Sequence, residues 1–126
     1  QQAGRKARAV HVQGDGCFHF STPTSVYATS QQYGLPIFSV VLDNGGWQAV
    51  RDSVLRMHPN GAAAQHNQFH ARLQGPQRRF ELVAQAFGAH GERVSRADDM
   101  PGAIARCLQA LDEGRSALLV ASIARI

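Results

Sequence analysis

The chain has 126 residues, 44% of them hydrophobic, and a formal net charge of +4. This length and composition suit one domain with a single core, and no apolar run approaches the roughly 18 residues that span a membrane. No basic stretch is interleaved with aromatic side chains, so the charge does not indicate a nucleic-acid surface. We therefore expect one domain over residues 1–126, in a cytoplasmic protein with neither a nucleic-acid nor a membrane partner.

The first half of the chain contains two predicted strands. Alternating valines predict a strand over residues 7–13, which ends at the turn Gly14-Asp15-Gly16. A threonine N-cap at residue 22, followed by proline, then predicts a helix over residues 23–33 that a glycine stops. Residues 37–42 read Ile-Phe-Ser-Val-Val-Leu, which predicts a central parallel strand buried on both faces.

The second half continues the alternation of helices and strands. Trp47, Val50 and Val54 recur at helical spacing, which predicts a helix that buries Trp47 in the core and ends before Pro59. The remaining predicted elements are a loop over 61–76 with at most one helical turn, a helix over 78–87, a strand over 91–94, a helix from about 98 to 114 and a strand over 117–123. This alternation predicts an α/β three-layer sandwich with a mostly parallel sheet of at least four strands.

Two side chains with oxygen ligands follow the first two strands. Asp15 lies between glycines, and Asn44 precedes Gly45-Gly46. If the strands are parallel neighbours, both side chains emerge at the carboxyl edge, where open α/β sheets bind ligands. Magnesium prefers oxygen ligands and phosphate, so Asp15, Asn44 and the carbonyl of Gly46 are candidate metal ligands. Helix starts and glycines offer N–H groups to phosphate. One carboxylate holds Mg²⁺ weakly, so we expect metal and diphosphate to bind together.

Gly14-Asp15-Gly16, followed after 27 residues by Asn44, resembles the signature of thiamine diphosphate-dependent enzymes. Segments 33–44 and 80–91 are similar to the acetolactate synthase and benzoylformate decarboxylase branch, and the resemblance covers almost the whole chain. It implies the thiamine diphosphate-binding fold, with Mg²⁺ held by Asp15, Asn44 and the Gly46 carbonyl. The residues it implies for cofactor binding are Gly14, Asp15, Gly16, Cys17, Asn44 and Gly46. The usual Asn-Asn pair is Asp43-Asn44 here, which leaves the role of Asp43 open.

The resemblance also implies a larger enzyme. Its members decarboxylate a 2-oxo acid or join the resulting acyl unit to a second carbonyl, and they need a pyrimidine-binding domain that no segment here resembles. The chain also starts with Gln1 rather than methionine. We therefore expect the C-terminal part of a longer dimeric or tetrameric enzyme, inactive by itself. A separate subunit of a split enzyme and a non-catalytic phosphate-binding domain are the alternatives.

Other candidate sites carry less weight. His66 and His70 are four residues apart, as zinc ligands on a helix can be, but no third ligand is evident and a polar loop is favoured. The resemblance brings this segment, with His58, near the active site, yet assigns these histidines no role. Cys17 and Cys107 form no disulfide or metal pattern, so we expect reduced thiols, with Cys17 acting through its backbone N–H.

Overall fold

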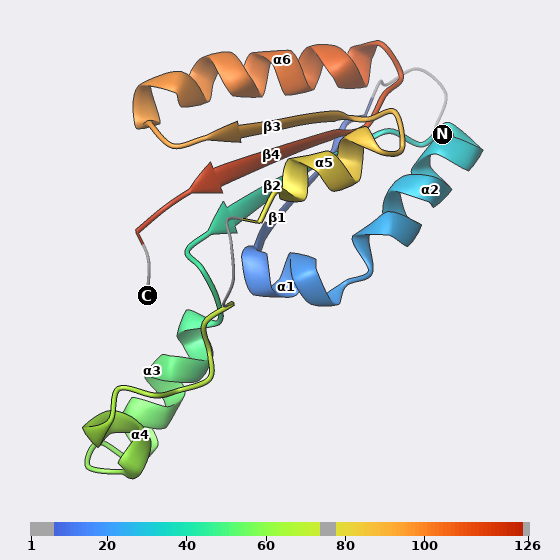
Figure 1. The fold of residues 1–126 in the computed structure, drawn as a ribbon. Helices are drawn as coiled ribbons and strands as arrows, with labels where there is room; N and C mark the ends of the chain where they lie inside the picture. Colours follow the sequence, from blue (N-terminus) through green and yellow to red (C-terminus); the bar gives the residue numbers. More distant parts are fainter. Residues whose placement is uncertain (1–6, 74–77, 125–126) are drawn as a thin grey trace.

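The structure, a computed structural model, describes residues 7–73 and 78–124, and a parallel β-sheet lies at its centre (Figure 1). The strands of the described chain are β1 (Ala9–Gly14), β2 (Ile37–Asp43), β3 (His90–Val94) and β4 (Ala117–Ser122). They lie in the order β1-β2-β4-β3, and each neighbouring pair is parallel. The prediction of a mostly parallel sheet of at least four strands is confirmed.

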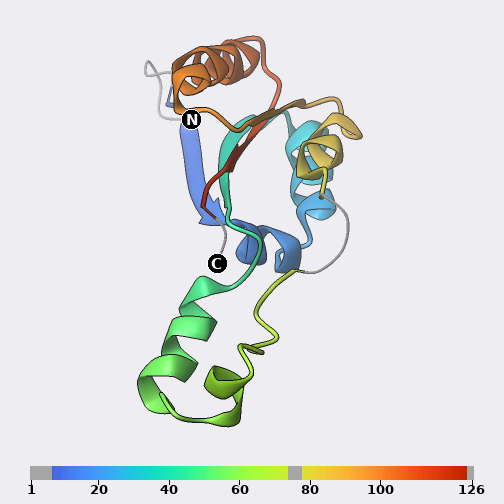
Figure 2. The same cartoon turned by 60° about the vertical axis from the view of Figure 1, so that its left-hand side comes forward.

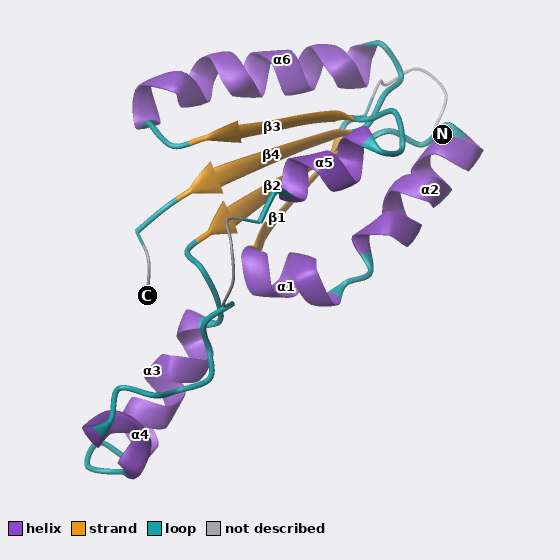
Figure 3. Ribbon diagram, in the orientation of Figure 1, coloured by secondary structure: helices purple, strands orange, loops and turns teal. Residues whose placement is uncertain are grey.

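Helices cover both faces of the sheet, which gives the predicted three layers. The helices of the described chain are α1 (Asp15–Phe20), α2 (Pro23–Tyr33), α3 (Gln48–Met57), α4 (Ala62–Gln65), α5 (Phe80–Gln85) and α6 (Met100–Asp112), with a 3₁₀ turn, η1 (Ala97–Asp99), before α6. Figure 2 shows α6 on one side of the sheet and α1, α2 and α5 on the other. Figure 3 distinguishes the helices and strands from the loops that join them. Among the described residues, no helix combines the length and apolar character needed to cross a membrane.

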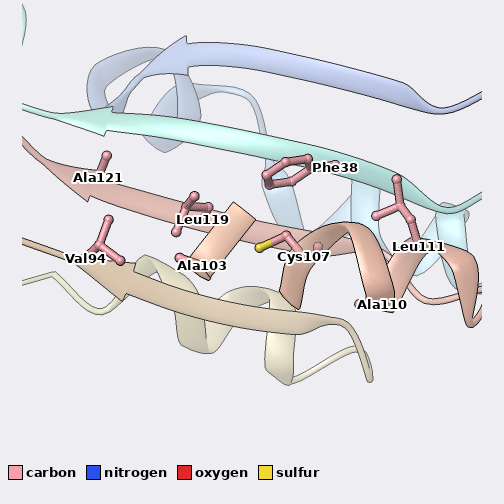
Figure 4. Close-up of a cluster of buried hydrophobic side chains, with 9 residues drawn as sticks. Phe38, Val94, Ala103, Cys107, Ala110, Leu111, Leu119 and Ala121 are labelled. Carbon is pink, nitrogen blue, oxygen red and sulfur yellow. The ribbon is translucent and has the colours of Figure 1, made fainter. Parts of the chain in front are cut away.

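Two clusters of buried apolar side chains hold the layers together. Between α6 and the sheet, Phe38, Cys107 and Leu119 lie among small side chains of α6 (Figure 4). On the opposite face, Phe18 and Tyr27, each 2% exposed, pack against the sheet and α5. Burying a large apolar side chain stabilises a fold by about 1.5–3 kcal/mol, so these two clusters fix α1, α2 and α6 against the strands.

β4, rather than β2, is the strand buried on both faces. Residues 117–121 of β4 are all buried, whereas Leu42 of β2 is 38% exposed. The sheet order explains the difference. β4 lies between β2 and β3, but β2 borders the edge strand β1, whose Val10 and Val12 are more than half exposed. The prediction that β2 is buried on both faces is therefore wrong at its carboxyl end.

Two details of the chain after β1 also differ from the prediction. The chain does not leave β1 through an open turn, because α1 begins directly at Asp15 and thereby places Phe18 against the sheet. Thr22 precedes α2 as predicted, but its φ is 49° and its side chain makes no capping hydrogen bond. Pro23 is the first residue of α2, and Gly34, with φ 60°, ends the helix as predicted.

Residues 47–73 form an arm that extends away from the sheet beyond the carboxyl end of β2 (Figures 1 and 2). The arm contains α3 and α4, and α4 is the helical turn allowed within the predicted loop over 61–76, whose last residues lie outside the described chain. At its base, the Trp47 N–H donates to the Ala71 carbonyl at 2.7 Å and the Leu73 N–H donates to the Gly45 carbonyl at 2.8 Å. These two hydrogen bonds close the arm beside the carboxyl edge of the sheet.

The two cysteines lie in opposite environments. Cys17 is exposed, whereas Cys107 is fully buried and burial raises its pKa to about 11. Because the thiolate is the reactive form, we predict that an aromatic disulfide reagent modifies Cys17 rapidly and Cys107 only after unfolding. Release of the coloured thiol measures both rates. Cys17→Ser should remove the fast phase, and two fast thiols in the native protein would contradict the prediction.

Candidate functional site

Asp15 and the Asn44 turn meet at the carboxyl edge of the sheet. β1 and β2 are paired up to Gly14 and Leu42, so the chain leaves both strands at neighbouring points. The Gly45 N–H donates to Oδ2 of Asp15 at 3.0 Å, which joins the two turns directly. The structure thus brings together the residues that the sequence analysis placed at one edge.

The Asp15 carboxylate is a buried group that is only partly satisfied. The residue is 1% exposed, and Oδ1 has no hydrogen-bond partner. Burial, and then the neighbouring Asp43 carboxylate, raise the pKa of Asp15 above its usual value. A buried acceptor without a partner is destabilising, and a divalent cation that takes oxygen ligands would satisfy it. Asp15 therefore fits the role of a magnesium ligand.

Asn44 and Gly46 bring two neutral oxygens to the same turn. The Asn44 amide donates to Oε1 of Gln48 at 3.3 Å, and its Oδ1 accepts from the Gly46 N–H at 3.2 Å. In the described chain, no backbone hydrogen bond ends on the Gly46 carbonyl. One carboxylate with two neutral oxygens leaves coordination positions for water and phosphate, which is the arrangement that Mg²⁺ commonly adopts. The residues present therefore fit magnesium and a diphosphate.

The residues predicted to meet the diphosphate lie at the start of α1. Gly14 ends β1, Gly16 is buried and Cys17 is exposed. A glycine is required at position 16, because a Cβ there would overlap the indole ring of Trp47. The first N–H groups of a helix have no acceptor within the helix, so this turn directs donors towards the edge that holds Asp15.

Trp47 is not the core residue that its helical spacing predicted. It belongs to neither buried cluster, and its ring lies over Gly16 and meets Phe20 edge to face with centroids 5.7 Å apart. The reason is that α3 leaves the sheet and has no buried residue within the described chain. Trp47 therefore lies beside the predicted diphosphate-binding residues.

The sequence analysis missed a network of charged side chains around Asp43. Nη1 of Arg93 donates to Oδ2 of Asp43 at 2.8 Å. Nη2 of Arg78 lies 3.5 Å from Oδ1 of Asp43 and 3.8 Å from Oδ2 of Asp15. Burial by itself raises the pKa of Asp43, but the hydrogen bond from Arg93 and the charges of both arginines hold it below its usual value. The aspartate in front of Asn44 was the signal in the sequence for a charged network. Its partners, Arg78 and Arg93, are 35 and 50 residues further along the chain.

The histidines do not form a zinc site. α4 ends before His66, and His70 has φ 48°, so these two residues do not share a helix face. In the part of the chain that the structure describes, no three His, Cys, Asp or Glu side chains gather as a metal site. His70 instead lines a pocket of about 320 Å³ in the arm, together with Arg51 and Arg72. The other histidines considered above, His58 and His66, are exposed.

Comparison with known proteins shows the family of the chain. Residues 1–121 match the family model described as thiamine pyrophosphate enzyme, C-terminal TPP binding domain. No curated protein matches the chain.

Two solved structures share the fold over 96% of this chain. A thiamine diphosphate-dependent 4-hydroxybenzoylformate decarboxylase from Rhodococcus jostii RHA1 has a TM-score of 0.73 at 19% identity. A benzoylformate decarboxylase from Polynucleobacter necessarius has a TM-score of 0.71 at 24% identity. The matched region covers 20% of each of those chains.

Proposed function

Because this chain belongs to the thiamine pyrophosphate enzymes, as their C-terminal cofactor-binding domain, we propose that it binds the diphosphate of the cofactor through Mg²⁺. The proposed metal ligands are Asp15, Asn44 and the carbonyl oxygen of Gly46. The observation that carries this assignment is the buried Asp15 carboxylate, whose Oδ1 has no partner and whose Oδ2 is tied to the Asn44 turn by the Gly45 N–H.

Each proposed residue has a distinct task. Asp15 supplies the negative charge that attracts the metal, and the Gly45 N–H holds its carboxylate in one orientation. The backbone at Gly16 and Cys17 donates to the diphosphate oxygens, and the Trp47 ring covers Gly16. When bound, the cofactor supplies the electron sink for breaking or forming a carbon–carbon bond next to a carbonyl. The domain positions the cofactor for that chemistry.

We propose the reaction of the whole enzyme from the names of the two structural relatives. Both are named as decarboxylases of an aryl 2-oxo acid, so decarboxylation of a 2-oxo acid is the first candidate, and an acetolactate synthase-like carboligation is the second. The chain covers 20% of those relatives. We infer a cytoplasmic, oligomeric enzyme in which a pyrimidine-binding domain of the same or another subunit completes the cofactor site.

Calorimetric titration with thiamine diphosphate tests the proposal. We predict binding in the presence of Mg²⁺ and none after the metal is removed with EDTA, because without the cation the Asp15 carboxylate repels the negatively charged diphosphate. Trp47 is the only tryptophan of the chain, so its fluorescence should change in the same titration. Thiamine without the diphosphate is the matched control and should not bind. Equal affinity with and without metal would contradict the proposed site.

A further inference from the structure

Two arginines contact the Asp43 carboxylate, and their hydrogen bonding differs. Arg93 is fixed, because its guanidinium donates to Asp43 at 2.8 Å, to Ser122 Oγ at 2.9 Å and to the Arg78 carbonyl at 2.7 Å. Arg78 has one short hydrogen bond, to the Leu73 carbonyl at 2.5 Å. Its Nε is buried and has no partner. The charge of Arg93 is thus shared between Asp43 and the buried Glu81, whose Oε2 lies 3.3 Å from its Nε, whereas Arg78 makes no ion pair closer than 3.5 Å among the described residues.

Arg78 shares its charge between the two carboxylates of the site. Its Nη2 lies 3.5 Å from Asp43 and 3.8 Å from Asp15, and both distances are longer than a good hydrogen bond. The Arg78 side chain is 21% exposed and that of Asp15 is 1% exposed, so solvent screens their attraction only in part. A cation at this distance lowers the attraction of Asp15 for a second cation. Arg78 and a metal ion therefore compete for the charge of Asp15.

We propose that Arg78 is a resident counter-ion of the metal site and that Asp43 controls it. Without metal, the Arg78 guanidinium partly neutralises the Asp15 carboxylate. When the metal ion takes its place beside Asp15, Asp43 remains as the carboxylate that neutralises Arg78. The pair Asp43–Arg78 thereby sets how tightly the site holds a divalent cation. This inference rests on the proposed function, because it takes Asp15 as the metal ligand.

Titration with Mn²⁺ alone, followed by electron paramagnetic resonance of the free ion, tests the competition. Arg78→Gln removes the charge and keeps a polar side chain, and it should bind Mn²⁺ about fivefold to tenfold more tightly than the unaltered chain. Arg96→Gln is the matched control. It removes the same formal charge from a side chain that is 75% exposed and paired with the exposed Asp98, and it should change the affinity less than about twofold.

Asp43→Asn provides a second, independent variant. It leaves Asp15 as the one carboxylate beside Arg78, so Mn²⁺ affinity should fall about fivefold. In the Arg78→Gln background, Asp43→Asn should lower the Mn²⁺ affinity much less. Comparing the two single variants with the double variant isolates the coupling between the two side chains. Thermal unfolding of every variant shows which of them are folded, and Asp43→Asn keeps the test informative if Arg78→Gln does not fold.

The outcomes separate this inference from the proposed function. If the unaltered chain binds Mn²⁺ and Asp15→Ala binds it equally tightly, Asp15 is not a metal ligand and both proposals are wrong. If Asp15→Ala loses the metal but Arg78→Gln binds no more tightly than the unaltered chain, the counter-ion role is wrong and the proposed function stands. Equal tightening in Arg78→Gln and Arg96→Gln would also overturn the role, because it would reflect net charge alone. A Mn²⁺ affinity that does not fall in Asp43→Asn would also overturn the counter-ion role.

Discussion

Replacing Asp15 with asparagine is expected to abolish Mg²⁺-dependent binding of thiamine diphosphate while the fold remains intact. The proposed site has one carboxylate ligand, and removing the charged partner of a buried cation costs about 3–5 kcal/mol, or a loss of affinity of at least about 100-fold. The asparagine has nearly the same shape, and its carbonyl oxygen can still accept the hydrogen bond that the Gly45 N–H makes to Asp15. Calorimetry with thiamine diphosphate and Mg²⁺ measures the loss.

A control for this variant is Asp112→Asn, which makes the same change at the end of α6. Asp112 pairs with Arg8 at the surface, where each side chain is 49% exposed, and such pairs contribute little to stability. Asp112→Asn should therefore bind the cofactor as the unaltered chain does. Retained binding in Asp15→Asn would show that the metal has other ligands, and the assignment of Asp15 would be wrong.

The stability of the metal-free protein distinguishes a ligand role from a structural one. The pKa of Asp15 is raised in the folded state, chiefly by burial, so the folded protein binds this proton more tightly than the unfolded chain does. The resulting stabilisation is present below the unfolded pKa and is lost as the pH rises through the folded pKa. At neutral pH the Asp15 carboxylate therefore destabilises the metal-free protein. Urea unfolding in EDTA should find Asp15→Asn at least as stable as the unaltered chain.

The positions of Asp15 and Asn44 could be predicted because their signals are local. Each follows a short apolar strand and adjoins glycine, and parallel pairing of neighbouring strands then brings both to one edge. The glycine at position 34 likewise marked the end of α2. Where a residue type and its immediate neighbours determine the backbone, sequence reasoning located the element to within a few residues.

The features that could not be predicted depend on distant parts of the chain. Arg78 and Arg93 reach Asp43 because α5 and β3 pack against β4, which pairs with β2, and no spacing in the sequence indicates that meeting. The apolar residues of α3 predicted a buried face, but periodicity says only that a helix has an apolar side, not which element covers it. The burial of β4 instead of β2 likewise depends on the strand order.

Replacing Gly46 with alanine is expected to have the largest effect on stability, because two requirements meet at this residue. Its φ of 156° is unusual for a residue with a side chain, and a Cβ would overlap the Ala71 carbonyl. That carbonyl accepts the Trp47 N–H hydrogen bond at the base of the arm, so relief of the overlap must break it. We expect a loss of about 2–4 kcal/mol, measured by urea unfolding.

The control for Gly46→Ala is Gly102→Ala in α6. A Cβ at Gly102 would come no closer than 3.3 Å, to the flexible end of Arg106, and alanine favours a helix over glycine by about 1 kcal/mol. Gly102→Ala should therefore leave the stability unchanged or raise it. Loss of the hydrogen bond at the base of the arm should also expose residues 47–73 to limited proteolysis. Because the Gly46 carbonyl is a proposed metal ligand, Gly46→Ala should weaken Mg²⁺-dependent cofactor binding as well. If the arm opened while binding stayed unchanged, the Gly46 carbonyl would not be a ligand.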